Sequence, residues 1–342
     1  MLNFLLLMVV MITTINVSAQ NTHWCATDEV TNAALQNSAA ARTEQNQLEA
    51  FTQQYVQNFQ PSYFRSTGTA VYVIPVVFHI IHNWGPENIS DAQVYDAIRI
   101  LNRDYNGQRT DTANIIPDFK ALNADVQIEF RLAHKDPNGN CTNGIDRQQS
   151  LLTYDAGDAS KLNPWPYNKY LNIWTVSYFG SSHASAAAYA YKPGTAPPGK
   201  DGIIALHNYV GSIGTGSSTG QYTLTHEIGH WLNLNHTWGG TNQPGVACGD
   251  DNVTDTPVTK GYTNCPSPSN ADVCTPGIIE NYQNYMDYSY CYYMFTLGQK
   301  ARMWAALNSG AGLRNQVHTA TNLANTGTDG GTYICSPSAS FS

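Results

Sequence analysis

The stretch HEIGHWLNLNH, residues 226–236, carries three histidines and one glutamate in a fixed spacing. Residues four apart lie one above the other on a helix, so His226 and His230 can direct their imidazoles at one ion. Glu227 lies about 100° further round the helix, away from the ion but within reach of a water bound to it. Because imidazole nitrogens suit Zn²⁺, the pattern predicts a zinc site with Glu227 as general base.

His236 is the predicted third ligand, and it follows His230 by six residues. Its ring can reach the same ion only if the helix stops and turns near position 233. Glycine is the usual residue at such a turn because the conformation is left-handed, and Asn233, the next most tolerant type, stands there. The whole string is close to HExxHxxGxxH. The alternative for His236, a histidine at a helix end that binds nothing, stays open.

A second short motif follows downstream in residues 284–288, NYMDY. It resembles the Met-turn that lies beneath the zinc of metzincins. Met286 would provide an apolar floor, and the Tyr288 hydroxyl would lie near the developing oxyanion or the zinc. The alternative is that Met286 and Tyr288 are ordinary core residues of an aromatic-rich segment.

The N-terminus predicts export. Leu5–Ile12 is an unbroken apolar run, and Val17-Ser18-Ala19 has the small residues of a signal-peptidase site, although no Lys or Arg precedes the run. We therefore expect a signal peptide at residues 1–19, with a buried N-terminal helix as the alternative. The run is too short to span a bilayer comfortably, and no later stretch is apolar enough to do so. The sequence thus predicts a secreted, extracellular protein without a membrane span.

Composition agrees with this location. Of the 342 residues, 42% are hydrophobic and only 12% are charged, and the formal net charge is −8. A negative chain is a poor partner for nucleic acid or for an anionic membrane. Seven cysteines suit an oxidising compartment, and their odd number leaves at least one thiol without an internal partner.

The chain divides into a prosegment, an α/β part and an irregular part. Residues 20–67 are rich in Gln, Asn, Ala and Thr and predict a prosegment with a polar helix over 32–59; Arg65-Ser66 is a candidate processing point. Hydrophobic patterns predict strands at 71–82, 124–132, 170–176 and 202–206, and helices at 90–105, 223–234 and 295–307. Residues 237–276 read as loops, and the last 30 or so residues are weakly patterned.

Several segments in the same order resemble the pappalysin family of metzincin metallopeptidases. They include IPVVFHIIH (74–82), TLTHEIGHWLNLNHTWGG (223–240) and NYMDYSYCYYMFTLGQKARM (284–303), and the resemblance spans residues 71–310. It implies an α+β, metzincin-like fold: a twisted mixed sheet with backing and active-site helices above the cleft, and an irregular, disulfide-stapled lower subdomain with a C-terminal helix. The catalytic domain would cover 68–310, dividing after about residue 236, with a tail at 311–342.

The resemblance also implies two disulfides in the lower subdomain, Cys248–Cys274 and Cys265–Cys291. The residues alone allow three pairings of these four cysteines. Two disulfides would stabilise a long stretch that has few apolar residues.

The family binds structural calcium in this region, which is acidic in this chain. Candidate ligands are Asp251, the Val253 carbonyl and Thr256, all of which offer hard oxygens. The alternative is an acidic turn that binds no ion.

Cys25 lies early in the predicted prosegment. Relatives stay latent because a prosegment residue, in some cases a Cys, occupies the open position of the zinc. A thiolate is a strong zinc ligand, so we hypothesise that Cys25 is such a latch. The alternative is a disulfide between Cys25 and Cys141 or Cys335.

These features together predict a secreted zinc-dependent endopeptidase, made as a latent zymogen, that acts on polypeptides. One alternative is a catalytically silent binding or adhesion module with a structural zinc, although such a site has no need of Glu227. Another is a zinc hydrolase that acts on something other than peptides. The loop 288–293, YSYCYY, carries no acid that could pair with a buried Arg or Lys. We therefore expect an apolar or aromatic residue after the scissile bond.

Overall fold

A computed structural model describes residues 24–60 and 72–333 of the chain. The predicted signal peptide at 1–19 and the candidate processing point Arg65-Ser66 lie outside the described residues. Within the described residues, no helix is long and apolar enough to cross a membrane.

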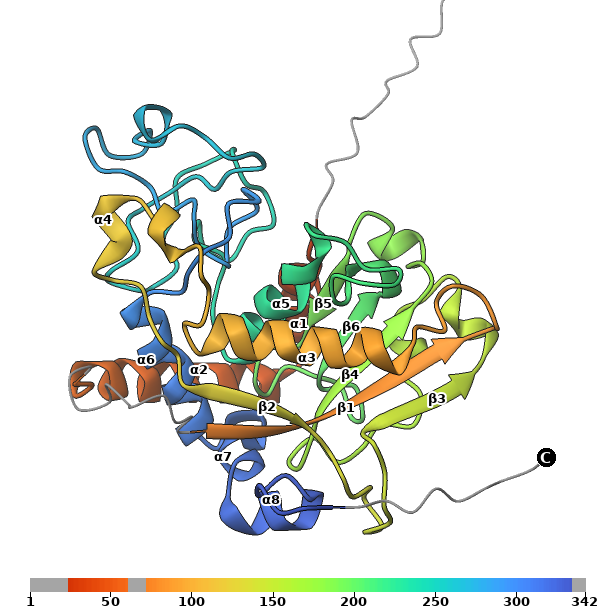
Figure 1. The fold of residues 1–342 in the computed structure, drawn as a ribbon. Helices are drawn as coiled ribbons and strands as arrows, with labels where there is room; N and C mark the ends of the chain where they lie inside the picture. The colour runs from red at the N-terminus through yellow and green to blue at the C-terminus, as the bar shows by residue number, and fades with distance from the viewer. Residues whose placement is uncertain (1–23, 61–71, 334–342) are drawn as a thin grey trace, which may run out of the picture.

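One six-stranded sheet forms the centre of the molecule (Figure 1). Its strands run in the order β2-β1-β4-β6-β5, and β3 pairs with β1 beyond the end of β2. All pairings are parallel except that of β5 with β6. The strands are β1 Tyr72–His82, β2 Ile128–Leu132, β3 Ile145–Gln149, β4 Leu171–Val176, β5 Ala188–Ala190 and β6 Ile203–Leu206.

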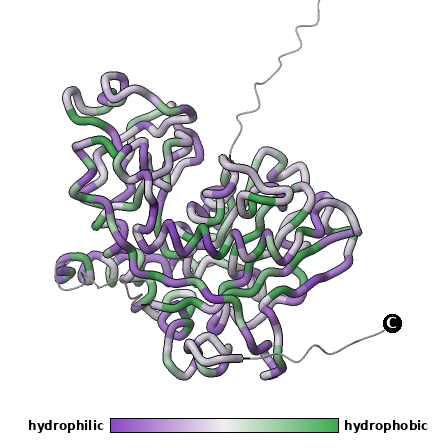
Figure 2. The backbone as a smooth tube through the Cα atoms, viewed as in Figure 1, coloured by the Kyte–Doolittle hydropathy of each residue, from purple (hydrophilic) through white to green (hydrophobic). Residues whose placement is uncertain are grey.

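The central strand β1 is the sequence YVIPVVFHIIH, which is buried from Ile74 to its end. Burial on both faces suits a strand with parallel neighbours on either side. Figure 2 shows hydrophobic residues along the centre of the sheet, where β1 and its neighbour β4 are buried. The predicted strands are present, but β2 begins only at Ile128, because Gln127 has a φ of 62° that no strand residue adopts.

Eight α-helices surround the sheet within the described residues. They are α1 Thr27–Asn37, α2 Ala39–Gln57, α3 Asp91–Tyr105, α4 Pro117–Lys120, α5 Thr223–Trp231, α6 Leu297–Asn308, α7 Arg314–Val317 and α8 Ala320–Thr326. The helix α3 runs across one face of the sheet (Figure 1), with Ser90 as its N-cap and Val94, Ala97 and Leu101 buried. The last two helices lie in the segment that the sequence left weakly patterned.

The chain from 237 to 294 contains one short 3-10 turn and no α-helix or extended strand. It contains both disulfides that the resemblance implied, Cys248–Cys274 and Cys265–Cys291. The helix α6 follows, begun by a capping box between Thr296 and Gln299. The α+β fold, with a mixed sheet and an irregular stapled part that ends in a helix, is as predicted.

The predicted polar helix of the prosegment is two helices. The first, α1, lies beside β5 and α5, while α2 packs along α6 (Figure 1). Ahead of α1, Cys25 forms a parallel bridge with Ala188 of β5, and the Ala26 N–H donates to the Ala188 carbonyl at 3.0 Å. Residues 24–26, which belong to the predicted prosegment, therefore extend the sheet at the edge nearest α5.

Candidate active site

The three histidines of residues 226–236 converge on one point. Their Nε2 atoms lie 3.1 Å (His226–His230), 3.2 Å (His226–His236) and 3.2 Å (His230–His236) apart. All three side chains are buried. Zn–N bonds of about 2.0–2.1 Å at tetrahedral angles would separate the nitrogens by about 3.4 Å. The observed triangle is close to that size.

The other ring nitrogen of each histidine faces an acceptor. His226 Nδ1 lies 2.7 Å from the Tyr285 carbonyl, His230 Nδ1 2.8 Å from the Leu234 carbonyl, and His236 Nδ1 2.8 Å from an Asp28 carboxylate oxygen. These acceptors place the ring proton on Nδ1, so the Nε2 lone pairs point at one another. Three lone pairs meet favourably only around a cation, and the site therefore fits a metal ion such as zinc.

Burial keeps the imidazoles in the form that binds metal. It lowers the pKa of His226 to about 3 and, reinforced by the neighbouring histidines, holds the pKa of His230 well below its usual value. Neutral imidazole is the ligand form, because a protonated ring has no free lone pair.

His236 reaches the site because the helix ends early. The helix α5 stops at Trp231, ahead of the predicted end at residue 234, and Asn233 adopts a φ of 71°. The Leu234 N–H then donates back to the Gly229 carbonyl at 2.9 Å, which closes the turn. The left-handed turn predicted at Asn233 is present. At its other end the helix begins at Thr223; Tyr222 precedes it without a side-chain bond, and the Thr225 hydroxyl donates to Asp104 at 2.8 Å.

Glu227 lies beside the histidines and is fully buried. Its Oε2 accepts a hydrogen bond of 2.9 Å from the Thr27 hydroxyl, and its Oε1 has no partner among the described residues. Burial raises the pKa of Glu227 to about 8 in spite of the bonds that Cys25 and Thr27 offer it. A cation at the histidine cluster would favour the ionised carboxylate, the form that can accept a proton.

Cys25 completes the cluster. One ligand atom each from Cys25, His226, His230 and His236 lie within 4.8 Å of one another. Cys25 is a free, buried thiol, so it forms no disulfide with Cys141 or Cys335; Cys141 is itself disulfide-bonded. Burial, with the charge of Glu227, raises the pKa of the Cys25 thiol. A thiolate here therefore needs a metal ion to stabilise it.

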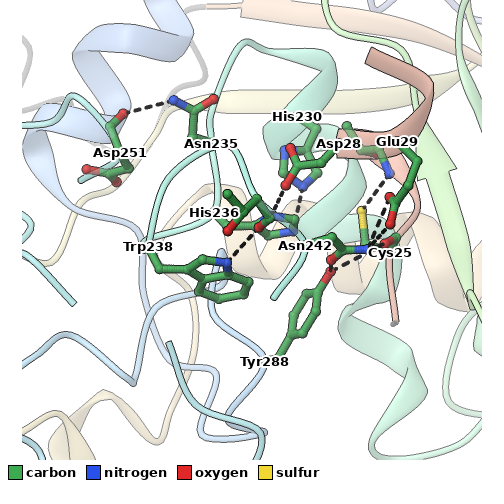
Figure 3. A network of polar contacts seen from close by, with 12 residues as sticks. Cys25, Asp28, Glu29, His230, Asn235, His236, Trp238, Asn242, Asp251 and Tyr288 are labelled. Carbon is green, nitrogen blue, oxygen red and sulfur yellow. Dashed lines mark hydrogen bonds and ion pairs between the residues drawn. The ribbon is translucent and has the colours of Figure 1, made fainter. Parts of the chain in front are cut away.

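Residues next to Cys25, in the predicted prosegment, contact the other groups of the site, as Figure 3 shows for part of the network. Asp28 binds the third histidine, and Thr27 binds Glu227. Glu29 accepts from Asn242 at 2.9 and 3.1 Å. The sequence analysis missed Thr27, Asp28 and Asn242. Only the proximity of the first two to Cys25 could have singled them out.

The Met286 side chain lies directly beneath α5. A Cβ atom on Gly229 would lie 2.5 Å from the Met286 sulfur, so the helix and the turn are packed without a gap. The turn is tied to the site twice, through the Tyr285 carbonyl on His226 and through the Thr237 N–H on the Met286 carbonyl at 3.3 Å. Met286 thus packs against the helix that carries His226 and His230.

Tyr288 is buried against the histidines. Its ring centroid lies 5.0 Å from that of His236 and 5.6 Å from that of His226. The hydroxyl donates to Asn242 Oδ1 at 2.6 Å and lies 3.5 Å from the Cys25 carbonyl. The phenol is therefore close enough to the metal site to interact with a group bound there.

The predicted calcium ligands also lie together. The Thr256 hydroxyl lies 2.5 Å from Asp251 Oδ1 and 2.7 Å from the Val253 carbonyl. Asp251 Oδ2 is buried without a partner among the described residues, and burial raises the pKa of this carboxyl to about 7. Asp255, in contrast, accepts from Thr296 and Gly298 at the start of α6 and is not directed at this group.

Comparison with known proteins places this geometry in a family. The family model for peptidase M43, described as Pregnancy-associated plasma protein-A, matches residues 156–308. The chain is 28% identical over 259 residues to an extracellular metalloprotease of Colletotrichum graminicola, which covers 72% of this chain and 79% of the relative. An extracellular metalloprotease of Arthroderma otae is 29% identical over 254 residues, covering 71% and 81%.

Two solved structures of Tannerella forsythia proteins are similar throughout. Mature mirolysin in complex with a cleaved peptide is 36% identical, covers 76% of this chain and 99% of its own, and has a TM-score of 0.66. A promirolysin mutant is 31% identical, covers 86% and 97%, and has a TM-score of 0.71. The sequence identity extends over nearly the whole of each solved relative, and the site has the geometry described above. These findings identify the chain as a member of the pappalysin (M43) family of metzincin zinc metalloendopeptidases.

Proposed function

We propose that this protein is a secreted endopeptidase, made as a latent zymogen, that hydrolyses internal bonds of polypeptides with Glu227 as general base. The observation that carries this proposal is the convergence of three Nε2 atoms beside the Glu227 carboxyl. A structural metal site has no use for an acidic residue held next to it without direct coordination. The extracellular metalloproteases among the relatives support secretion.

Zinc held by His226, His230 and His236 would acidify a water and polarise the scissile carbonyl. Glu227 would accept the proton of that water and return it to the leaving amine. Tyr288 would direct its hydroxyl at the charge that develops on the carbonyl oxygen. The Met286 floor would keep the three imidazoles in place.

The test compares the zinc-loaded, processed protein with Glu227→Gln on casein and on gelatin, with and without a zinc chelator. The wild type should cut both substrates and stop when the chelator is added. Glu227→Gln should keep its zinc, measured by metal analysis, and lose turnover. If the zinc-loaded wild type cuts no polypeptide, the proposal is wrong, and a silent zinc-containing binding or adhesion module is the better interpretation.

We further propose that Cys25 is the latency latch. Its position in the histidine cluster supports this, as does the match to promirolysin, which covers 86% of this chain against 76% for the mature form. An unprocessed Cys25→Ala chain should cut a peptide that the unprocessed wild type leaves intact. Equal silence of the two chains would exclude the latch, and Cys25→Ala with Glu227→Gln controls for contaminating proteases.

Calcium is the proposed occupant of the oxygen cluster at Asp251, Val253 and Thr256. The support is the buried, unpartnered Asp251 Oδ2, which is costly unless an ion or proton satisfies it. Calcium should raise the melting temperature of the wild type and leave that of Asp251→Asn unchanged. The neighbouring, exposed Asp250 is the matched control: Asp250→Asn should respond like the wild type. If calcium leaves the wild-type melting temperature unchanged, the proposal of a calcium site is wrong.

An apolar or aromatic residue is the proposed preference after the scissile bond. A small pocket beside the histidines is lined by Trp24, Thr219, Tyr222, Thr223, Tyr290 and Tyr292, with Glu227 as its only acid. Trp24 of the prosegment packs edge-on against Tyr290, at a centroid distance of 4.9 Å. A peptide-library profile should show apolar or aromatic residues at this position, and a dominant Arg or Lys would contradict the proposal.

The proposed division of the chain follows from these roles. Residues 1–19 would be the signal peptide, 20–67 the prosegment, 68–310 the catalytic domain and 311–342 a tail. N-terminal sequencing of the active form tests the second boundary directly.

A further inference from the structure

Asn242 lies in a loop without any recognisable motif, yet its side chain is buried at the candidate active site. Its Oδ1 accepts from the Tyr288 hydroxyl at 2.6 Å. Its Nδ2 donates to the Cys25 carbonyl and to both carboxylate oxygens of Glu29. A carbonyl and a carboxylate only accept hydrogen bonds, which fixes the orientation of the amide: Nδ2 faces the prosegment and Oδ1 faces Tyr288 (Figure 3).

The loop that carries Asn242 is locked onto the third histidine. The Trp238 ring stacks on His236 with a centroid distance of 4.6 Å and an interplanar angle of 1°. Its indole N–H donates to the Thr241 carbonyl at 2.7 Å, next to Asn242. Trp238 also packs edge-on against Tyr288, at 5.0 Å. The same side chain therefore fixes His236, Tyr288 and the loop that holds Asn242.

The two ends of the Asn242 amide bind residues from different parts of the chain. The partner of Oδ1, Tyr288, belongs to the catalytic domain, whereas both partners of Nδ2 belong to the proposed prosegment. Removal of the prosegment would leave Tyr288 bound and would free the Nδ2 donor. In this structure Nδ2 donates to the main-chain carbonyl of Cys25. The side chain of Cys25 lies in the histidine cluster. A polypeptide bound in place of residues 25–29 would offer the donor a main-chain carbonyl of the same kind.

We propose that Asn242 is a positioning residue of the mature enzyme. Its Oδ1 holds the Tyr288 phenol beside the metal site until the O–H, the one proton that the phenol can donate, turns from Oδ1 to the reacting carbonyl, and its Nδ2 donates to a main-chain carbonyl of the substrate where it now binds Cys25. The proposal rests on the endopeptidase function proposed above. The competing role is confined to latency: Asn242 would bind the prosegment and contribute nothing afterwards.

The experiment uses the processed, zinc-loaded enzyme with Asn242→Ala, Asn242→Asp, Tyr288→Phe and the double variant Asn242→Ala/Tyr288→Phe. Asn242→Ala should lower kcat on the order of tenfold to a hundredfold, because an unheld phenol is misplaced. The double variant should be no slower in kcat than Tyr288→Phe alone, since residues that act as a unit do not add. Asn242→Asp keeps an acceptor for Tyr288 but loses the donor, so it should mainly raise KM.

Two controls separate positioning from damage. Gln243→Ala changes the exposed neighbour and should behave like the wild type, and all variants should keep their zinc and their circular dichroism spectra. Binding of a product peptide to the Glu227→Gln form is the readout that needs no turnover. Adding Asn242→Asp should weaken that binding about tenfold, the loss of one hydrogen bond in a desolvated cleft.

Full activity of processed Asn242→Ala, or kcat losses that multiply in the double variant, would overturn the positioning role. The role of Asn242 would then be confined to latency. That failure is distinct from failure of the endopeptidase function, in which the wild type itself would cut nothing. Unchanged peptide binding by the Asn242→Asp form would overturn the substrate contact.

Discussion

Each metal-site histidine depends on the residue that fixes its second nitrogen. For His226 and His230 that residue offers a backbone carbonyl from the catalytic part of the chain. For His236 it is the Asp28 carboxylate, which belongs to the proposed prosegment. Partners of this kind orient metal ligands and raise their basicity. His236 is therefore the histidine whose surroundings would change most on removal of the proposed prosegment.

Thr27 gives a first prediction at this scale. Its hydroxyl donates to Glu227 Oε2 at 2.9 Å, and it also accepts from the Ala190 N–H at 2.8 Å. Thr27→Val keeps the shape and removes both bonds, which costs about 1–3 kcal/mol for buried polar groups. We expect the unprocessed Thr27→Val chain to show measurable peptide turnover, while Thr27→Ser stays as silent as the wild type. Equal silence of all three in a fluorogenic-peptide assay would contradict this.

Lys161 gives a second prediction, on stability and pH. Its ammonium is fully buried, bonded to the Lys200 carbonyl and packed over Tyr189 and Tyr191. Burial lowers the pKa of Lys161 from 10.5 to about 8. Between these values the unfolded chain binds a proton that the folded protein has released, so the free energy of unfolding rises with pH.

The rise in the free energy of unfolding that Lys161 causes should reach about 3 kcal/mol between pH 8 and 10.5. Lys161→Met should remove that part of the slope in urea titrations across this range. The exposed Lys120 is the control, because Lys120→Met should leave the slope of the wild type unchanged. Parallel slopes for Lys161→Met and the wild type would show that the ammonium is not titrating there.

At the scale of elements, the site depends on the packing of α5 against the Met286 turn. A helix interior normally favours Ala over Gly by about 1 kcal/mol. At Gly229 the steric term is larger, since the added methyl would lie 2.5 Å from the Met286 sulfur. Overpacking of this kind costs about 1–3 kcal/mol, so sterics exceed helix propensity.

We therefore predict that Gly229→Ala lowers both the free energy of unfolding and the zinc affinity. In a Met286→Ala background, which makes room, the same substitution should be nearly neutral. Gly310→Ala is the matched control, because nothing lies within 4 Å of its Cβ position. Denaturant unfolding and zinc competition measure both quantities, and a stabilised Gly229→Ala would show that the contact relaxes freely.

At the scale of the whole molecule, the proposed prosegment is attached at two places. Residues 25–29 occupy the candidate active site, and α2 packs along α6. Arg302 of α6 binds Glu49 of α2 through both terminal nitrogens, at 3.0 and 2.5 Å, and its Nε donates to the Asn233 carbonyl. One guanidinium thus joins the prosegment helix to the turn that brings His236 to the metal site.

Glu49→Gln should weaken this second attachment, because a charge-assisted bidentate pair becomes a neutral contact. We expect prosegment loss to be a few-fold faster in a processing time course followed by gel electrophoresis. The specific activity after complete processing should equal that of the wild type, since residue 49 is then gone. Gln54→Ala, at an exposed position of α2, should process like the wild type. Unchanged kinetics for Glu49→Gln would show that residues 25–29 alone hold the prosegment.

The sequence by itself determined the family, the metal-binding helix and most of the regular elements. Long apolar runs such as β1 and strict spacings such as 226–236 express local physics, and local physics is readable from a linear pattern. The same reasoning missed β3, a largely polar strand, and β5, which is three residues long and made of Ala and Tyr. Neither carries enough periodicity to be recognised without its neighbours.

Only the tertiary structure decided which residues surround the metal site. Thr27 and Glu227 are separated by 200 residues, Asp28 and His236 by 208, and Asn242 and Tyr288 by 46. The first two pairs depend on the edge pairing of Cys25 with β5, and the third joins two loops of the irregular part 237–294. No spacing rule links such positions, because their proximity is produced by the packing of the whole fold rather than by the geometry of any one helix or strand.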